Sequence, residues 1–211
     1  FIAFDNYVKI FKDRQFINSF WVTLKFSLIE TPLQMLIGII ISAIIAKNNF
    51  FNRCVRSIYF LPVITSAVTV GIMWQMLLHS NVGLFTWWLQ ILGFGKINLL
   101  NDPNTALYAV IGVSLWRSFG ISTIILVSAI QNVPIDYYEA AELDGASKIR
   151  QFFSITLPDI MPAVWFLLMT RIIGSLQVFD IIYTLTNGGP NKSTNTLVLY
   201  VYTQAFTKNN N

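Results

Sequence analysis

The sequence predicts an all-α, polytopic membrane protein with about four transmembrane helices, and three observations lead to that prediction. Of the 211 residues, 55% are hydrophobic and only 11% are charged, against about 25% charged residues in ordinary soluble domains. The mean hydropathy is +0.59. Four apolar runs are each long enough to cross a bilayer as a helix, which takes about 20 residues, and their residues do not alternate as the strands of a membrane barrel do.

The apolar runs cover residues 17–46, 57–78, 105–130 and 158–185. The first is longer than one crossing requires, so we expect it to be tilted or to begin outside the hydrocarbon. The second contains no charged residue. The third contains Arg117, and the fourth contains Arg171 and Asp180. Each run therefore predicts one spanning helix.

The basic residues predict the orientation of these helices. Lys47, Arg53 and Arg56 lie between the first and second runs, and Lys148 and Arg150 lie between the third and fourth. Lysine and arginine gather on the cytoplasmic side of membrane helices, so both connections should be cytoplasmic. Residues 1–16, 79–104 and the tail from 187 then face outward. Four basic residues oppose this orientation near the N-terminus, namely Lys9, Lys12, Arg14 and Lys25.

Composition and motifs exclude several classes of function. The net charge of +4 is not gathered into a basic patch, so the expected surroundings are membrane lipid and not nucleic acid. Cys54 and His79 are the only cysteine and the only histidine, which excludes an intramolecular disulfide and a multi-cysteine metal site. The sequence lacks the phosphate-binding pattern G-x-x-x-x-G-K-[ST]. We therefore expect no enzyme activity, no metal and no ATP site in this chain.

The connection formed by residues 131–157, called the coupling loop below, carries the most specific local pattern. Pro134 breaks the preceding helix, and residues 135–143 read as a short helix with Asp136 and Glu139 in its first turns, where the helix dipole favours negative charge. Gly145 predicts the end of that helix, because glycine adopts the left-handed conformation found at helix ends.

A second helix of about ten residues should follow, with Ser147 as its N-terminal cap. Its apolar residues recur at helical spacing, at Ile149, Phe152, Phe153 and Thr156. The coupling loop is therefore predicted to be a compact helix–turn–helix with an acidic, alanine-rich tip. A solvated amphipathic connection without a partner is the alternative interpretation of the same spacing.

These residues also carry a resemblance to a known family. Glu139-Ala140-Ala141-x-x-Asp144-Gly145-Ala146, followed by Phe152, Ile155, Leu157-Pro158 and Pro162, resembles the EAA loop of ABC-importer permeases. Four further segments resemble the carbohydrate-type group, which includes maltose, multiple-sugar and glycerol-3-phosphate permeases: Pro32-Leu33-Gln34 with Gly38, Phe60-Leu61-Pro62, residues 175–180 and residues 186–190.

The resemblance implies a permease subunit of an ATP-driven importer in a bacterial or archaeal cell membrane. Its solute would be a sugar, an oligosaccharide, a polyol or a glycerol phosphate, delivered by an extracellular binding protein. The implied partners are a second, related permease subunit and two ATPase subunits, which bind the ATP. The residues that would couple to an ATPase are Glu139, Ala140, Ala141, Asp144, Gly145 and Ala146. Residues 1–211 would form one permease domain that lacks a flanking helix at each end.

Charged residues inside the predicted spans point to a solute pathway. An ionised group near mid-bilayer costs at least about 2.5–3.5 kcal/mol, so Glu30, Arg117, Arg171 and Asp180 each need a partner or a wet cavity. Helix-to-helix ion pairs that only fix packing are the alternative. On one ideal helix Arg171 and Asp180 would lie on opposite faces, and we expect Arg171 to find another partner, for instance Glu30.

Sugar sites combine planar polar groups with aromatic surfaces. Late in the fourth run such a set is formed by Gln177, Phe179, Asp180 and Tyr183, with Gly174 providing room, and Trp116 and Arg117 could face it from the third run. A self-sufficient secondary transporter or channel would also explain the buried charges. It gives no reason for the acidic coupling loop.

Overall fold

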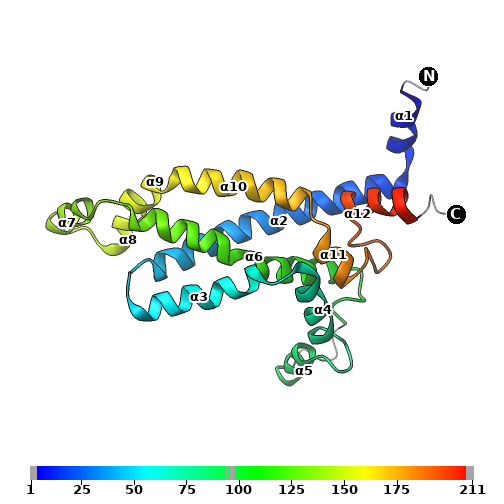
Figure 1. The fold of residues 1–211 in the computed structure, drawn as a ribbon, viewed down its shortest axis with the longest axis horizontal. Helices are drawn as coiled ribbons and strands as arrows, with labels where there is room; N and C mark the ends of the chain where they lie inside the picture. Colours follow the sequence, from blue (N-terminus) through cyan, green and yellow to red (C-terminus); the bar gives the residue numbers. More distant parts are fainter. Residues whose placement is uncertain (1–3, 94, 96–97, 208–211) are drawn as a thin grey trace. The chain divides into compact units, whose positions relative to one another are not determined.

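The computed structural model describes residues 4–93, 95 and 98–207, apart from the side chains of Asp5 and Asn6. These described residues form helices and no strand (Figure 1). The chain divides into two compact units. The first consists of Phe1–Glu30, Thr65–Leu115 and Ile173–Asn211, and the second of Thr31–Ile64 and Trp116–Ile172. Lys96 and residues 208–211, which belong to the segments 79–104 and 187 onward that were predicted to face outward, lie outside the described residues.

Two helices are long and apolar enough to cross a membrane, namely α2 (Arg14–Ile45) and α6 (Ala106–Gln131). Two bent pairs of shorter helices pass the same criteria: α3 (Phe50–Ile64) with α4 (Ala67–Leu77), and the helical segment Lys148–Asp159 with α10 (Met161–Leu176). The described chain thus has two spans, or four if each bent pair counts as one. The all-α class and about four spans are confirmed.

Breaks between helices correct two sequence predictions. The run 57–78 is not one helix, because α3 ends at Ile64 and α4 begins at Ala67. The run 158–185 is broken after Leu176, where residues 177–179 are not helical and Phe179 has φ −138°. Arg171 and Asp180 therefore do not share one helix, and the argument about opposite faces does not apply. Apolar periodicity alone could not reveal a break that keeps the same composition on both sides.

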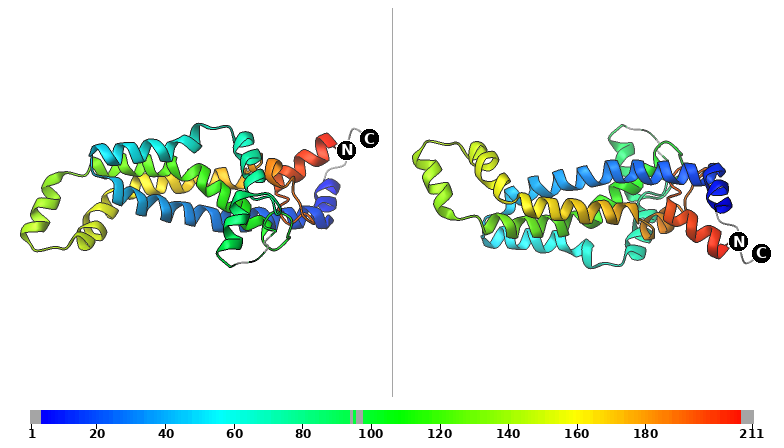
Figure 2. Two further views of the ribbon diagram at one scale, coloured as in Figure 1. Left: turned by 90° about the horizontal axis from the view of Figure 1, so that it is seen from below. Right: turned by 90° about the horizontal axis from the view of Figure 1, so that it is seen from above.

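The second unit has its apolar core where α2, α6 and α10 meet. Its buried members are Met35, Leu126, Val133, Ile160 and Leu167. The cyan α3, green α6 and yellow α10 run side by side in both views (Figure 2). At Gly120 a Cβ atom would overlap the carbonyl oxygen of Tyr59, so only glycine permits this approach of α3 to α6. The coupling loop leaves this bundle as α7 (Ile135–Leu143), α8 (Lys148–Gln151), a π-helical turn (Phe152–Thr156) and α9 (Leu157–Asp159).

The first unit contains the shorter helices α1 (Asp5–Lys12), α5 (Leu84–Ile91), α11 (Asp180–Leu185) and α12 (Leu197–Tyr202), which continues as a π-helical turn to Thr207. Helix α5 lies in the connection 79–104, for which no helix was predicted. Helices α4 and α11 pack closely, because a Cβ atom at Gly71 would overlap the side chain of Thr184. Ile182 and Leu199 are fully buried in this unit.

Candidate functional site

The turn of the coupling loop is formed by backbone hydrogen bonds around Gly145. Gly145 has φ +76°. Its N–H donates to the Glu142 carbonyl over 3.0 Å, and the Ala146 N–H donates to the Ala141 carbonyl over 2.9 Å. This pair of bonds ends a helix by satisfying carbonyls that have no partner within it. The prediction that α7 spans residues 135–143 and ends at Asp144-Gly145 is confirmed.

The second helix of the coupling loop begins where Ser147 predicted it. The Ser147 side chain accepts a hydrogen bond from the Arg150 N–H over 3.4 Å, and the chain is helical from Lys148 to Asp159. The π-helical turn Phe152–Thr156 inside this segment was not predicted. Such turns occur often at functional sites, and this one lies where the loop passes into α10.

Side chains hold the two helices of the coupling loop together. The hydroxyl groups of Tyr138 and Thr156 are 2.8 Å apart, and the Lys148 ammonium forms an ion pair with Glu142. The hydrogen bond from Lys148, followed by its positive charge, lowers the pKa of the Glu142 carboxyl below its ordinary value. The Gln151 amide also donates to the Ala146 carbonyl over 3.1 Å. These contacts make the coupling loop a braced, rigid pair of helices.

The tip of the coupling loop is exposed. Among the predicted coupling residues, Glu139, Ala140, Asp144 and Gly145 are exposed, and Ala141 and Ala146 are half-buried. Large apolar side chains lie exposed beside them, including Ile135, Tyr137, Ile149, Phe153 and Leu143, which is 90% exposed. A contiguous apolar surface of this kind marks a site that another protein or a membrane covers. Together with Glu139, it gives the tip an apolar surface and a negative charge.

A cavity of 630 Å³ lies between the coupling loop and the ends of α2 and α6. Its lining includes Lys47, Gln131, Tyr138, Glu139 and Phe152, all in the second unit. The volume falls in the range of small-molecule pockets, about 300–1,000 Å³. Packing of the loop against the membrane helices is therefore incomplete, which leaves room for α7 to be displaced as a body.

Two of the four charged residues of the predicted solute pathway, Glu30 and Arg171, form hydrogen bonds with serine hydroxyls. Glu30 is fully buried and accepts a hydrogen bond from the Ser114 hydroxyl over 3.4 Å within the first unit. Arg171 donates to the Ser118 hydroxyl over 3.1 Å within the second unit. Arg117 is half-buried in that unit. Because Glu30 and Arg171 belong to different units, their pairing stays a prediction.

Polar residues that the sequence reasoning passed over join the helices of each unit. The Gln34 amide donates to the Ser118 carbonyl over 3.1 Å and to the Ser122 hydroxyl over 3.2 Å. In the first unit, the hydroxyls of Ser27 and Ser175 are 2.6 Å apart. Ser118 and Ser122 are four residues apart and therefore share a helix face, a signal that could have found them. These bonds favour a packing role for part of the polar set.

The structure brings together several residues of the predicted solute site. Phe179 lies in the break between α10 and α11, and its ring stacks on Tyr183 with centroids 5.4 Å apart. Tyr202, which was not predicted, contacts both rings with centroid distances of 5.1 and 5.7 Å. Gln177 and Asp180 flank Phe179 in the same break. A Cβ atom at Gly174 would meet nothing within 4 Å, as the prediction of local room requires.

Trp116, Arg117 and Arg171 belong to the second unit. The other residues of the predicted solute site belong to the first unit. That the two groups face each other therefore stays a prediction. The break itself leaves backbone groups to be satisfied: the Thr196 hydroxyl donates to the Val178 carbonyl over 3.2 Å. Irregular backbone at membrane depth is tolerated where it is buried in protein or lines a cavity.

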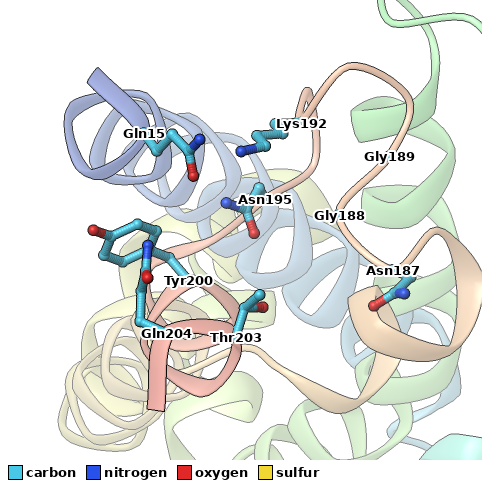
Figure 3. A pocket seen from close by; sticks show the side chains of 9 residues that line it. All are labelled: Gln15, Asn187, Gly188, Gly189, Lys192, Asn195, Tyr200, Thr203 and Gln204. Atoms are coloured by element: carbon cyan, nitrogen blue, oxygen red, sulfur yellow. The ribbon is translucent and has the colours of Figure 1, made fainter. Parts of the chain in front are cut away.

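The loop of residues 186–196, called the 186–196 loop below, was quoted in the resemblance without a role. It borders a polar pocket of 220 Å³, shown with nine labelled residues in Figure 3. The Asn195 amide donates to the Ser19 hydroxyl over 2.9 Å. Tyr200 also lines the pocket. Its hydroxyl donates to the Asp13 carboxylate over 2.6 Å, and this hydrogen bond raises the pKa of Tyr200.

Comparisons with known proteins agree with this geometry. A family model described as "Binding-protein-dependent transport system inner membrane component" matches residues 34–208. The trehalose/maltose transport system permease protein MalF of Thermococcus litoralis is 34% identical over 202 residues, covering 96% of this chain and 68% of the relative. The sn-glycerol-3-phosphate transport system permease protein UgpA of Shigella flexneri is 31% identical over 208 residues, covering 98% of this chain and 70% of the relative.

A solved structure is also similar over almost the whole chain. It is the crystal structure of a bacterial alginate ABC transporter in complex with an alginate pentasaccharide-bound periplasmic protein. The superposition gives a TM-score of 0.90 at 26% identity and covers 99% of this chain and 73% of the other. The helical arrangement described above is therefore one found in a membrane transporter.

Proposed function

Because the chain belongs to the binding-protein-dependent transport system inner membrane component family, we propose that it translocates a sugar or sugar-like solute as the transmembrane permease subunit of an ATP-driven ABC importer. It is a membrane transport component and not an enzyme. The observation that carries the proposal is the exposed, braced helix–turn–helix of the coupling loop, which lies inside the region that matches the family. Relatives named for trehalose and maltose and for glycerol 3-phosphate support the solute class.

The coupling loop supplies the contact with an ATPase subunit. Its exposed apolar residues, with Leu143 and Ile149 among them, would be buried in a cleft of that subunit, and Glu139 would meet a basic group there. The Tyr138–Thr156 hydrogen bond and the Glu142–Lys148 ion pair let the loop move as one body, so that displacement reaches α10 and is not absorbed by the loop. Two such partner subunits bind the ATP, and this chain does not bind it.

The complex also includes a second, related permease subunit and an extracellular binding protein, in a bacterial or archaeal cell membrane. The periplasmic protein in the alginate transporter complex supports the last partner. The solute passes the break at residues 177–179, where Gln177 and Asp180 offer hydrogen-bonding groups beside the stacked rings of Phe179 and Tyr183. Broken helices at such positions line the solute sites of other transporters.

The test of coupling is Glu139→Lys in the importer reconstituted with both ATPase subunits and the binding protein. ATP-driven uptake should be lost while the membrane subunits still assemble, because a positive charge would face the basic group of the cleft. Asp136→Lys is the matched control, since Asp136 lies exposed one turn earlier on α7. Normal uptake by the Glu139→Lys variant would refute the proposal. Uptake without any ATPase subunit would favour a secondary transporter or channel instead.

The test of the solute pathway is Gln177→Ala and Asp180→Ala, each measured as solute-stimulated uptake. Both variants should raise the solute concentration needed for half-maximal uptake, because each removes a hydrogen-bonding group from the broken segment. Gln90→Ala serves as the control, since Gln90 is exposed on α5. If both pathway variants keep wild-type uptake kinetics, the solute does not contact this segment.

A further inference from the structure

The 186–196 loop borders two small cavities of the first unit. The cavities have volumes of 220 and 260 Å³, and Asn187 and Gly189 line both of them. Each volume is below the range of about 300–1,000 Å³ that holds a drug-sized molecule. Each cavity therefore has room for one small ring, and the loop between them is shared by both.

The lining of both cavities is rich in groups that bind hydroxyls. Gln15, Lys192 and Asn195 contribute to the first cavity, where their side chains lie close to one another above the end of α12 (Figure 3). Gln75 and Asn101 contribute to the second. Amide groups both donate and accept hydrogen bonds, as each sugar hydroxyl requires. No carboxylate lines either cavity among the described residues.

The second cavity also reaches the aromatic group of the proposed pathway. Tyr183 lines it, and the Tyr183 ring stacks on Phe179. Planar amides beside aromatic rings are suited to a saccharide, whose hydroxyls lie around an otherwise apolar ring. Tyr183 therefore connects the second cavity to the aromatic group of the proposed pathway.

The loop between the cavities is fixed before any ligand arrives. Thr194 and Thr196 are fully buried, and the Thr194 hydroxyl lies 2.7 Å from both the Thr186 hydroxyl and the Gly189 carbonyl. The Asn18 amide donates to the Lys192 carbonyl over 2.9 Å. A preorganised loop loses little binding free energy to ordering when a ligand binds. A weak, transient contact with a solute requires this, because little binding free energy is available to order the loop.

Of the two residues that line both cavities, Asn187 and Gly189, only Asn187 has a side chain that can form hydrogen bonds. Its φ is +48°, in the left-handed region that asparagine and glycine tolerate better than other residues. We propose that the 186–196 loop is a saccharide-binding element, with one sugar unit in each cavity and the Asn187 amide hydrogen-bonding between them. This rests on the proposed function and narrows the solute class to saccharides of at least two linked rings.

The experiment compares Asn187→Gly with Asn191→Gly in the assembled importer in lipid nanodiscs, without the binding protein. Asn191 also has φ +48° and is exposed, but it lines neither cavity. Both variants keep a residue that accepts the left-handed conformation. Binding of maltose, trehalose, maltotriose and glucose is followed by saturation-transfer NMR. At least one of the three oligosaccharides should bind the wild type, about three- to tenfold more weakly after Asn187→Gly and unchanged after Asn191→Gly.

Four results would overturn the inference: wild-type binding by Asn187→Gly, equal weakening by both variants, glucose binding as tightly as the oligosaccharides, or no binding of any probe to the wild type. A further result would be that Asn187→Gly binds saccharides normally but loses the stimulation of ATP hydrolysis by the binding protein. That result would overturn the inference too, because it would mean that the loop contacts the binding protein. The proposed function fails separately, through the Glu139→Lys test and through absent solute-stimulated ATP hydrolysis in the wild type.

Discussion

The coupling loop and the 186–196 loop are both connections with left-handed residues, but they are held in opposite ways. In the coupling loop the Tyr138–Thr156 bond joins residues 18 positions apart, and the Glu142–Lys148 pair joins residues 6 apart. In the 186–196 loop the bonds from Asn18 and Asn195 join residues 174 and 176 positions apart. The helix pair of the coupling loop is therefore held by bonds within the loop, whereas the 186–196 loop has bonds to other helices of its unit in addition to the bonds of Thr194 within it.

This difference suits the two roles. A segment that must be displaced by a partner should be held together internally, as the Tyr138–Thr156 bond and the Glu142–Lys148 pair hold the coupling loop, and the 630 Å³ cavity beneath the loop leaves part of its underside unpacked. A segment that recognises a solute should be fixed against its surroundings, as the buried Thr194 and Thr196 fix the 186–196 loop. Variants that break one kind of attachment should leave the other region unchanged.

The largest effect is expected from Gly145→Pro, which should abolish ATP-driven uptake. Proline fixes φ near −65° and has no N–H, whereas Gly145 has φ +76° and donates its N–H to Glu142. The angle between α7 and α8 would change, and the ATPase cleft would no longer fit. Uptake and ATP hydrolysis are measured in the reconstituted importer. Gly145→Asn should retain most activity because asparagine tolerates the left-handed conformation; equal activity of the two variants would contradict this.

The next largest effect is expected from Thr194→Val, on stability. Valine has a similar shape but leaves the half-buried Gly189 carbonyl without the hydrogen bond that Thr194 donates over 2.7 Å. An unsatisfied buried group costs about 1–3 kcal/mol, seen as a lower melting temperature of the detergent-solubilised complex. Thr170→Val is the control, since Thr170 is exposed and its hydroxyl only bonds its own helix. A melting temperature equal to that of the control would show that the Thr194 hydrogen bond does not hold the 186–196 loop.

The same contrast explains what the sequence could predict. Every signal that shapes the coupling loop is local: Pro134 starts it, Gly145 turns it and Ser147 caps its second helix, so its two helices were predicted almost to the residue. The π-helical turn at Phe152–Thr156 was missed because no residue type specifies it. Local signals of this kind depend only on neighbours along the chain, and a sequence displays those neighbours directly.

The break after Leu176 and the shape of the 186–196 loop were not predicted, because no residue type nearby marks either of them and side chains from other segments, such as Asn18, bond their backbone. In the break, the Val178 carbonyl accepts a hydrogen bond from the Thr196 hydroxyl. Apolar periodicity does not predict such a pairing. The aromatic part of the predicted solute site was found from residue types, and Phe179 and Tyr183 do stack. Tyr202 was missed, since it reaches them from a helix that follows the loop.

A smaller effect is expected from Tyr138→Phe, which tests whether the coupling loop is rigid. The variant loses the hydrogen bond to Thr156, worth about 0.5–1.5 kcal/mol, but keeps the ring. The loop should still bind the ATPase while transmitting less displacement, so more ATP is hydrolysed per solute transported. Tyr137→Phe is the control, because Tyr137 is exposed on the same helix. An unchanged ratio of hydrolysis to uptake in Tyr138→Phe would mean that this bond does not brace the loop.

The smallest effect is expected from titrating Glu142. Lys148 lowers the pKa of its carboxyl, so the folded loop holds the proton less tightly than the unfolded chain does. The pair therefore stabilises the loop at pH above 4.5, the ordinary pKa of glutamate, and this contribution is lost as pH falls through the lowered value. Because both side chains are largely exposed, the contribution is small and is screened by salt.

Amide hydrogen exchange of residues 143–148, corrected for the intrinsic effect of pH, measures this contribution. Protection should fall on acidification in the wild type. It should be lower and independent of pH in Glu142→Gln, which cannot ionise. Exchange in the 186–196 loop reports on the other region and should not respond to the Glu142→Gln substitution, since none of the hydrogen bonds described for that loop involves Glu142. A response there would mean that the two regions are coupled even without a partner subunit, and the contrast between a self-contained loop and an anchored one would fail.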